Sequence, residues 1–176
     1  TARRTELEAL LRFSQELNTQ LDVDSLLNLI LYLVIDLIPC DAAVIYRLDE
    51  SMNVLDYREH HKNDADDSVN VETLFNQIMA TPESPFAWEA LEVADTTFKN
   101  GIAIRLDHDM QTQGILVVLA NNPYGEHHIR LFETIARQTT LALRNAELYE
   151  TKVNYAEHLE EMVEQRTEEL RSAESL

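Results

Sequence analysis

The sequence is poor in cysteine, glycine and basic residues. Its single cysteine, Cys40, excludes an intramolecular disulfide and any zinc site built from several thiolates. Lys and Arg number 14 against 32 Asp and Glu, and the net charge of −18 argues against binding nucleic acid or an anionic membrane through bulk charge. The three glycines form no phosphate-binding loop, and no G-x-S-x-G or H-E-x-x-H motif is present. We therefore expect no catalytic activity.

Long apolar runs and a signal peptide are also missing. The most apolar stretch, residues 26–38, is 13 residues long, whereas a membrane-spanning helix needs about 20. Its polar residues Asn28, Tyr32 and Asp36 share one helical stripe, so we expect a buried helix and no membrane insertion. The low cysteine content fits a cytoplasmic protein. Because the chain opens on Thr1 and not on Met, we expect a piece of a longer protein.

The periodicity of the apolar residues predicts helices at both ends of the chain. An amphipathic helix is expected over residues 4–20, and a second helix capped by Asp22 or Asp24 runs to about residue 38, where Pro39 ends it. From residue 126 to the end, about 50 residues contain no Gly or Pro, which predicts a helix roughly 75 Å long.

The middle of the chain alternates short strands with one helix. Cys40 precedes the first strand and is expected to be a small buried residue. We expect a helix over residues 69–80 and a loop over 107–113. The expected strands span residues 42–48, 54–61, 88–95, 101–106 and 114–120. This order predicts an α+β fold, with an antiparallel sheet flanked by helices and a long C-terminal coiled-coil helix.

Two stretches resemble a GAF domain, the small-molecule-sensing and dimerising module of signalling proteins. They are "LDVDSLLNLILYLVIDLIPCDAAVIYRLDES" and "GILVVLANNPYGEHHIRLFETIARQTTLALRNAELYE", of which the "NAELY" ending is the most specific. The resemblance implies a sensor and dimerisation domain over residues 1–150. Residues 151–176 resemble the coiled connector that feeds histidine kinases and diguanylate cyclases, which implies a downstream effector domain in the parent chain.

The charged C-terminal segment has too few apolar residues to pack on a domain of its own. Its apolar positions keep 3–4 spacing, so we expect it to pair with a second chain as a parallel homodimer. The predicted seam is Tyr149, Lys152, Ala156, Leu159, Val163, Arg166, Leu170 and Ala173. A second register runs through Ile135, Thr139, Ala142, Ala146, Tyr149 and Val153, and the two registers conflict between Tyr149 and Ala156.

A ligand pocket is expected between the sheet and the segment 60–101, as the resemblance implies. Arg105 alternates with Ile104 and Leu106 along its strand, and a lone Arg in an apolar cup suits a carboxylate or phosphate. The candidate lining residues are Phe75, Ile78, Phe86, Trp88, Phe98 and Arg105. The alternative is that the aromatic residues form core and Arg105 is solvated.

The cofactor signatures of related domains are incomplete in this chain. Cyclic-nucleotide-binding relatives carry an Asn-Lys…Phe…Asp-Glu signature. In this chain Asn121 and the aromatic Tyr124 match its Asn and Phe, whereas Asn122 and residues 128–129 stand in place of its Lys and Asp-Glu. No Cys stands beside the histidines of "EHHKND" for bilin attachment, and methionine-sulfoxide-reducing relatives use several cysteines. We therefore expect no cofactor.

The histidines do not form an evident metal site. Adjacent strand residues such as His60 and His61 point to opposite faces and cannot chelate together without a bend. His127 and His128 diverge by about 100° at a helix start, and we expect surface roles for them and for His108. The sequence thus predicts a non-catalytic sensory and dimerisation module without a metal. A dimerisation spacer without ligand and a haem-bound redox sensor remain the alternatives.

Overall fold

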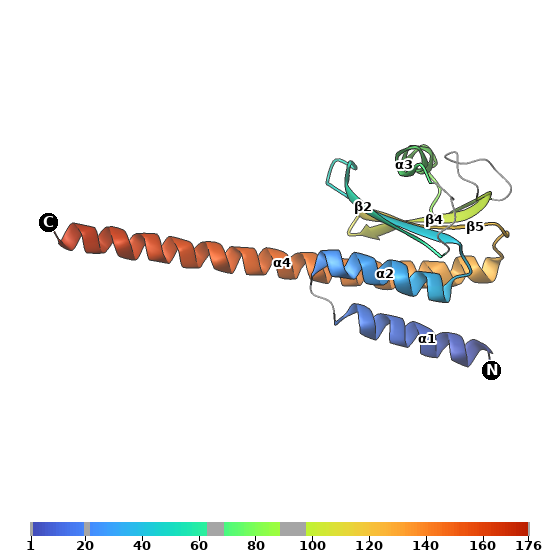
Figure 1. Ribbon diagram of the computed structural model, residues 1–176, viewed down its shortest axis with the longest axis horizontal. Helices are drawn as coiled ribbons and strands as arrows, with labels where there is room; N and C mark the ends of the chain where they lie inside the picture. The colour runs from blue at the N-terminus through green and yellow to red at the C-terminus, as the bar shows by residue number, and fades with distance from the viewer. Residues whose placement is uncertain (1, 20–21, 63–68, 89–97, 176) are drawn as a thin grey trace.

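The computed structural model describes residues 2–19, 22–62, 69–88 and 98–175, and it confirms the expected α+β fold (Figure 1). The helices are α1 (Ala2–Leu17), α2 (Val23–Leu37), α3 (Val71–Met79) and α4 (Glu126–Glu174). The strands are β1 (Ala42–Leu48), β2 (Val54–His61), β3 (Phe86–Trp88), β4 (Asn100–His108) and β5 (Gln111–Ala120). No helix among these residues is both long and apolar enough to cross a membrane.

The strands form one antiparallel sheet in the order β2-β1-β5-β4-β3. Helix α3 lies over one face of this sheet, while α2 and α4 lie over the other, with α1 outside them (Figure 1). Because successive side chains of a strand point to opposite faces, β1 contributes Ala43 and Ile45 to the core under α2 and α4 and contributes Val44 and Tyr46 to the core under α3. The two apolar layers explain why β1 and β5 read as nearly continuous apolar runs.

The predicted loop over residues 107–113 is wrong. Strand β4 continues to His108, β5 begins at Gln111, and these two residues pair with each other. The chain reverses at Asp109 and Met110, whose φ angles of 49° and 65° are those of a tight hairpin turn. Of the strand predicted over 88–95, Trp88 ends β3 and the remainder lies outside the described residues.

Helix boundaries follow the capping residues. The Asp22 side chain caps α2, because its Oδ2 accepts a hydrogen bond from the Ser25 backbone N–H at 3.0 Å. Asn70 caps α3 in the same way through Thr73. Helix α1 ends at Leu17, three residues before the predicted end at residue 20.

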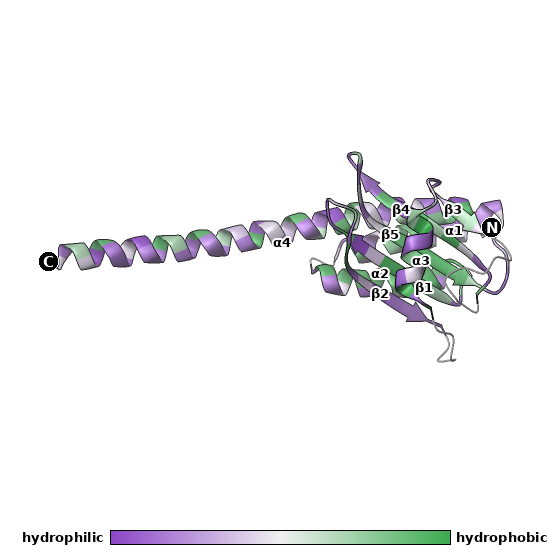
Figure 2. Ribbon diagram, turned by 90° about the horizontal axis from the view of Figure 1, so that it is seen from above, coloured by the Kyte–Doolittle hydropathy of each residue, from purple (hydrophilic) through white to green (hydrophobic). Residues whose placement is uncertain are grey.

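Helix α4 has two halves with different surroundings. Its first half packs on the sheet and on α2, and it buries nine residues: Leu131, Phe132, Ile135, Ala136, Thr139, Thr140, Ala142, Leu143 and Ala146. From residue 151 to residue 175 every residue is exposed, and this half projects from the domain (Figures 1 and 2). The upstream register noted in the sequence is therefore explained within the chain, since Ile135, Thr139, Ala142 and Ala146 contact the domain's own core.

Candidate functional site

Most of the predicted pocket residues lie together in the layer between the sheet and α3. Ile78, Trp88 and Phe98 are nearly inaccessible, at 3%, 4% and 1% exposure, and belong to one apolar cluster with Leu74 and Tyr46. Phe75 and Phe86 are partly buried against the same cluster. The sequence thus identified residues that meet in space, and three of them fill the centre of this layer.

Trp88 occupies its place because a glycine lies beneath it. Gly101, its partner across β3 and β4, sits against the indole ring, and a Cβ atom at that position would collide with the ring carbons. Phe86 packs beside the indole with a centroid separation of 5.5 Å. The indole Nε1 is buried and has no hydrogen-bond partner among the described residues.

An open groove of about 360 Å³ lies beside this cluster, between the β1–β2 hairpin and α3. Phe75 is the predicted residue that lines it. The others are Tyr46, Val54, Tyr57, Val71, Glu72 and Asn76. Tyr46 and Tyr57 are cross-strand partners, and the Tyr46 ring lies 6.3 Å from Tyr57 and 5.4 Å from Phe75 between centroids. Two tyrosines on neighbouring strands were the sequence signal that could have placed this groove.

Tyr46 lines the groove and anchors α3. Its hydroxyl donates a 2.7 Å hydrogen bond to the backbone carbonyl of Val71, the first residue of α3. Burial raises the pKa of the Tyr46 hydroxyl above its ordinary value, and the nearby Glu59 carboxylate adds to this effect. The hydroxyl therefore stays protonated at neutral pH and acts as a hydrogen-bond donor.

Arg105 does not line this groove. Its guanidinium donates to the Thr81 carbonyl at 3.2 Å, just after α3, and its backbone N–H donates to Ser84 Oγ at 3.0 Å. It borders a separate pocket of about 290 Å³ at the β4 edge, where Glu133 and Arg137 of α4 also lie. Arg105 is thus tied to the segment that follows α3.

The histidines and the cysteine do not gather into a metal-binding group among the described residues. No group of three or more His, Cys, Asp or Glu that could hold a metal occurs in the described parts of the chain. Cys40 is buried, as expected, and burial raises the pKa of its thiol to about 12, so it is a poor nucleophile. His128 accepts a hydrogen bond from the Gly125 backbone N–H, and His108 lies 3.2 Å from Asp109.

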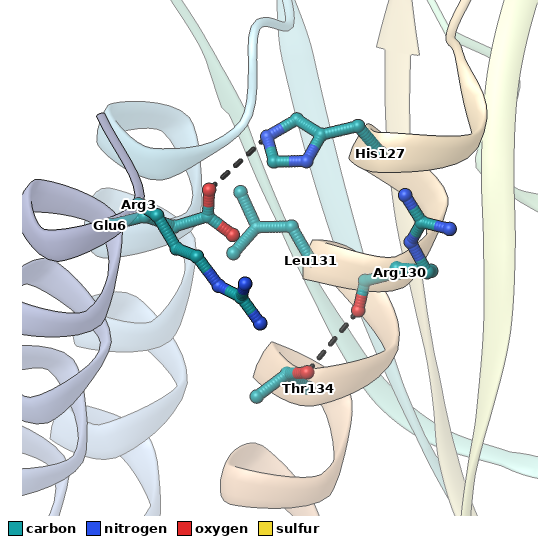
Figure 3. Close-up of a pocket in the computed structure, with 6 residues that line it drawn as sticks. All are labelled: Arg3, Glu6, His127, Arg130, Leu131 and Thr134. Atoms are coloured by element: carbon teal, nitrogen blue, oxygen red, sulfur yellow. Dashed lines mark hydrogen bonds and ion pairs between the residues drawn. The ribbon is translucent and has the colours of Figure 1, made fainter. Parts of the chain in front are cut away.

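A further groove, of about 610 Å³, separates α1 from the start of α4 (Figure 3). Arg3 and Glu6 of α1 face His127 and Leu131 of α4 across it. The Glu6 carboxylate lies 3.2 Å from His127 Nε2 and links the two helices. Arg3 and Arg130 line the groove with a single carboxylate, Glu6, so the groove carries a small net positive charge.

A chain of ion pairs joins the helices to the sheet at the point where α4 leaves the domain. Arg47 of β1 contacts both Glu147 of α4, at 3.6 Å, and Asp56 of β2, at 3.4 Å. Arg58 continues the chain from Asp56 to Asp24 of α2, at 3.6 and 2.9 Å. A displacement of α4 therefore changes charged contacts in the sheet and in α2 as well.

No family model matches the sequence, and no curated protein sequence matches it either. Solved structures do match. The GAF domain of an Acinetobacter phosphoenolpyruvate-protein phosphotransferase has a TM-score of 0.63 at 18% identity, over 82% of this chain and 95% of that one. The GAF domain of a putative sensor histidine kinase from Pseudomonas syringae pv. tomato has a TM-score of 0.60 at 16% identity, over 88% and 95%.

An enzyme is also among the similar structures. Free methionine-R-sulfoxide reductase from Neisseria meningitidis has a TM-score of 0.61 at 9% identity, over 81% of this chain and 90% of that one. The fold thus occurs in signalling proteins and in at least one enzyme, and identities this low establish fold and not activity. On these likenesses, this chain has the fold of a GAF domain.

Proposed function

We propose that this chain is a non-catalytic sensory and dimerisation module of a cytoplasmic signalling protein. Residues 1–150 would hold the sensing domain, and residues 151–176 would pass its state as a dimeric helix to a downstream effector such as a kinase or cyclase. The observation that carries this proposal is the division of α4 into a half that buries nine residues on the domain and a half in which every residue from 151 to 175 is exposed.

Two contacts support transmission through α4. The Arg47–Glu147 pair and the hydrogen bond from the Val23 N–H to Glu150 join α4 to β1 and to α2. Both contacts lie within one turn of the exposed half, so any change in the packing of the sheet or α2 acts at its base. A ligand drives such a change only if it binds two packing states with different affinity.

The open groove beside Phe75 supports a ligand-binding role, with Tyr46 and Tyr57 on its walls. The buried residues Ile78, Trp88 and Phe98 would then pack beside the groove and hold its lining residues in place. Thermal unfolding of the chain in the presence of a metabolite library tests this role, and a ligand whose stabilisation is lost in Phe75→Ala would support it. Gln77→Ala is the matched control, because Gln77 is exposed on the same helix and does not line the groove.

A spacer without ligand is the second candidate, and the filled layer around Trp88 and Phe98 favours it. Both candidates require a homodimer, which light scattering of the whole chain at tens of micromolar tests. A monomer there would contradict both. A haem-bound or other coloured protein on purification would favour the redox-sensor alternative.

A further inference from the structure

Two leucines in the packed half of α4 face solvent. Leu141 and Leu148 are each 53% exposed, although their neighbours Leu143 and Ala146 are buried in the core. An exposed leucine alone needs no explanation. These two lie seven residues apart, and the same spacing continues through Tyr155 to Met162 in the projecting half, both of which are also exposed.

These residues form one face of the helix. We define the α4 stripe as Leu141, Asn145, Leu148, Lys152, Tyr155, Leu159 and Met162. The steps along it alternate between four and three residues. An isolated α-helix has 3.6 residues per turn, so a strict seven-residue repeat stays on one face only when the helix supercoils around a partner. The α4 stripe therefore has the pattern of a coiled-coil seam, with Leu148 and Tyr155 at d positions and Asn145 and Leu159 at a positions.

The acidic residues avoid this face between Leu141 and Glu168, and the next one, Glu169, occupies a d position and ends the acid-free segment. Between residues 141 and 168, α4 carries seven glutamates, and each occupies a b, c or f position, on the side opposite the α4 stripe. They are Glu147, Glu150, Glu157, Glu160, Glu161, Glu164 and Glu168. In a chain with a net charge of −18, acids near a seam would repel a second copy of the same chain. Association with a second copy of this chain therefore requires a side of α4 that carries no acidic residues.

Upstream, the same face is already covered by α1. The a and d positions upstream of Leu141, three and four residues apart, are Gln138, Thr134, Leu131 and His127. Gln138 accepts a 3.0 Å hydrogen bond from Ser14 of α1, and His127 contacts Glu6 of α1. Figure 3 shows Glu6 and Arg3 facing this part of α4. Cover by α1 therefore ends where the exposed leucines begin.

We infer that a second copy of this chain docks in parallel along the α4 stripe, beginning at Leu141, so that Leu148, Tyr155 and Met162 each meet their own counterparts. This inference rests on the dimeric module proposed above and names its interface. The Asn145 pair would lie inside the seam, where a polar residue at an a position fixes register and favours a defined oligomer at a cost in stability. The length of α4 from Leu141 to Met162 is about 32 Å.

The identity of the partner follows from symmetry and charge. A two-fold interface places the same surface of each copy in contact, and the α4 stripe is self-complementary in a parallel arrangement. The register predicted from the sequence shares Lys152 and Leu159 with the α4 stripe, but it uses Tyr149, Ala156, Val163 and Leu170 in place of the other stripe residues. That register brings Glu160 to the edge of the seam, and its line does not pass through Leu141 and Leu148.

The first test is the oligomeric state of Leu141→Asp and Leu148→Asp, compared with the unchanged chain. We expect each substitution to weaken the dimer at least about tenfold, because the interface loses two leucines and gains two carboxylates. Both leucines are half-exposed in one chain, so circular dichroism should show a folded domain. Met110→Asp is the matched control, because Met110 is a fully exposed apolar residue at the β4–β5 turn. Dimers unaffected by both leucine substitutions would overturn the inference.

The second test separates the two registers by disulfide cross-linking. Leu148→Cys and Tyr155→Cys should each form a disulfide between the two copies under mild oxidation. Tyr149→Cys and Ala156→Cys should form it much more slowly. Glu157→Cys is the control on the far side of the helix, and the native Cys40 is buried. Faster cross-linking at Tyr149 and Ala156 would overturn this register while leaving a dimeric module intact. A chain that is monomeric by light scattering would instead reject the dimeric module itself.

Discussion

The Val23 backbone N–H donates a hydrogen bond to Glu150 Oε1 at 3.2 Å. Val23 is the first residue of α2, and Glu150 is the last partly buried residue of α4. A carboxylate at the start of a helix satisfies a free N–H group and interacts favourably with the helix dipole. This single contact therefore joins α2 to α4 at the base of the projecting half.

Glu150→Ala should lower the free energy of unfolding by about 1 kcal/mol, because it removes this acceptor. Glu150→Gln keeps an acceptor oxygen and should lose less. Urea unfolding followed by circular dichroism measures both. Glu157→Ala, at an exposed position seven residues further along the same face, is the control. Equal losses for Glu150→Ala and Glu157→Ala would show that the contact with α2 does not stabilise the domain.

Gly101→Ala should displace the Trp88 indole, because a Cβ atom at residue 101 would collide with the ring. Overpacking of this kind costs about 1–3 kcal/mol. Trp88 is the only tryptophan, so its fluorescence reports the displacement directly. Gly125→Ala is the control, since a Cβ atom there meets nothing within 4 Å. An unchanged emission spectrum and unfolding midpoint in Gly101→Ala would contradict the packing described for β3.

Tyr46→Phe should loosen the start of α3. The substitution removes the hydroxyl that donates to the Val71 carbonyl, and the loss of this partly buried hydrogen bond costs about 0.5–1.5 kcal/mol. Faster amide hydrogen exchange in α3 and a lower unfolding midpoint are the expected results. Tyr32→Phe is the control, because Tyr32 is 61% exposed on α2. If both variants unfolded alike, the Tyr46 hydroxyl would have no anchoring role.

Local patterns in the sequence predicted the helices and the first two strands well. The strands over 42–48 and 54–61, the Asp22 cap and the long C-terminal helix all occur as expected. Each depends on residues close together in the chain. The hairpin at Asp109 and Met110 was missed because two positive φ angles are normally announced by Gly or Asn, and this turn contains neither at those positions.

Long-range relationships could not be predicted in the same way. The apolar repeat of Ile135, Thr139, Ala142 and Ala146 showed that α4 has a buried face, but periodicity does not say whether the domain or a second chain covers it. Exposure is a property of the folded chain, so the solvent-facing positions of Leu141 and Leu148 needed the structure. The groove beside Tyr46 likewise depends on the pairing of β1 with β2.

Glu147→Gln should not destabilise the domain at pH 7. Burial raises the pKa of the Glu147 carboxyl above its ordinary value of 4.5, although Arg47 and Arg144 oppose this shift. Between the unfolded and folded pKa values the native state holds more protons, so the contribution of Glu147 to stability falls as the pH rises through that window. The unfolding free energy of the unchanged chain, relative to that of Glu147→Gln, should therefore fall as the pH rises above 4.5.

Unfolding at a series of pH values checks this, with Glu133→Gln as a control carboxylate from the same helix. Both substitutions remove one negative charge, so subtraction of the control removes the general effect of the net charge. If Glu147→Gln instead became more destabilising with rising pH, the attraction between Arg47 and Glu147 would outweigh the burial of the carboxylate.

The last prediction concerns transmission through α4 in a protein that carries an effector domain after residue 176. One alanine inserted after Glu150 rotates the downstream helix by about 100°, so Tyr155 and Met162 no longer lie in line with Leu141 and Leu148. Duplication of residues 151–157 adds seven residues, which are two turns of a supercoil, and it preserves that line. We expect the single insertion to lock the effector output on or off and the duplication to retain near-normal regulation. Both proteins keep the domain core unchanged, because its buried residues end at Ala146. The effector activity of each, measured with light scattering on the same samples, separates a change in output from a loss of the dimer. Equal activity after both insertions would mean that α4 is a passive tether.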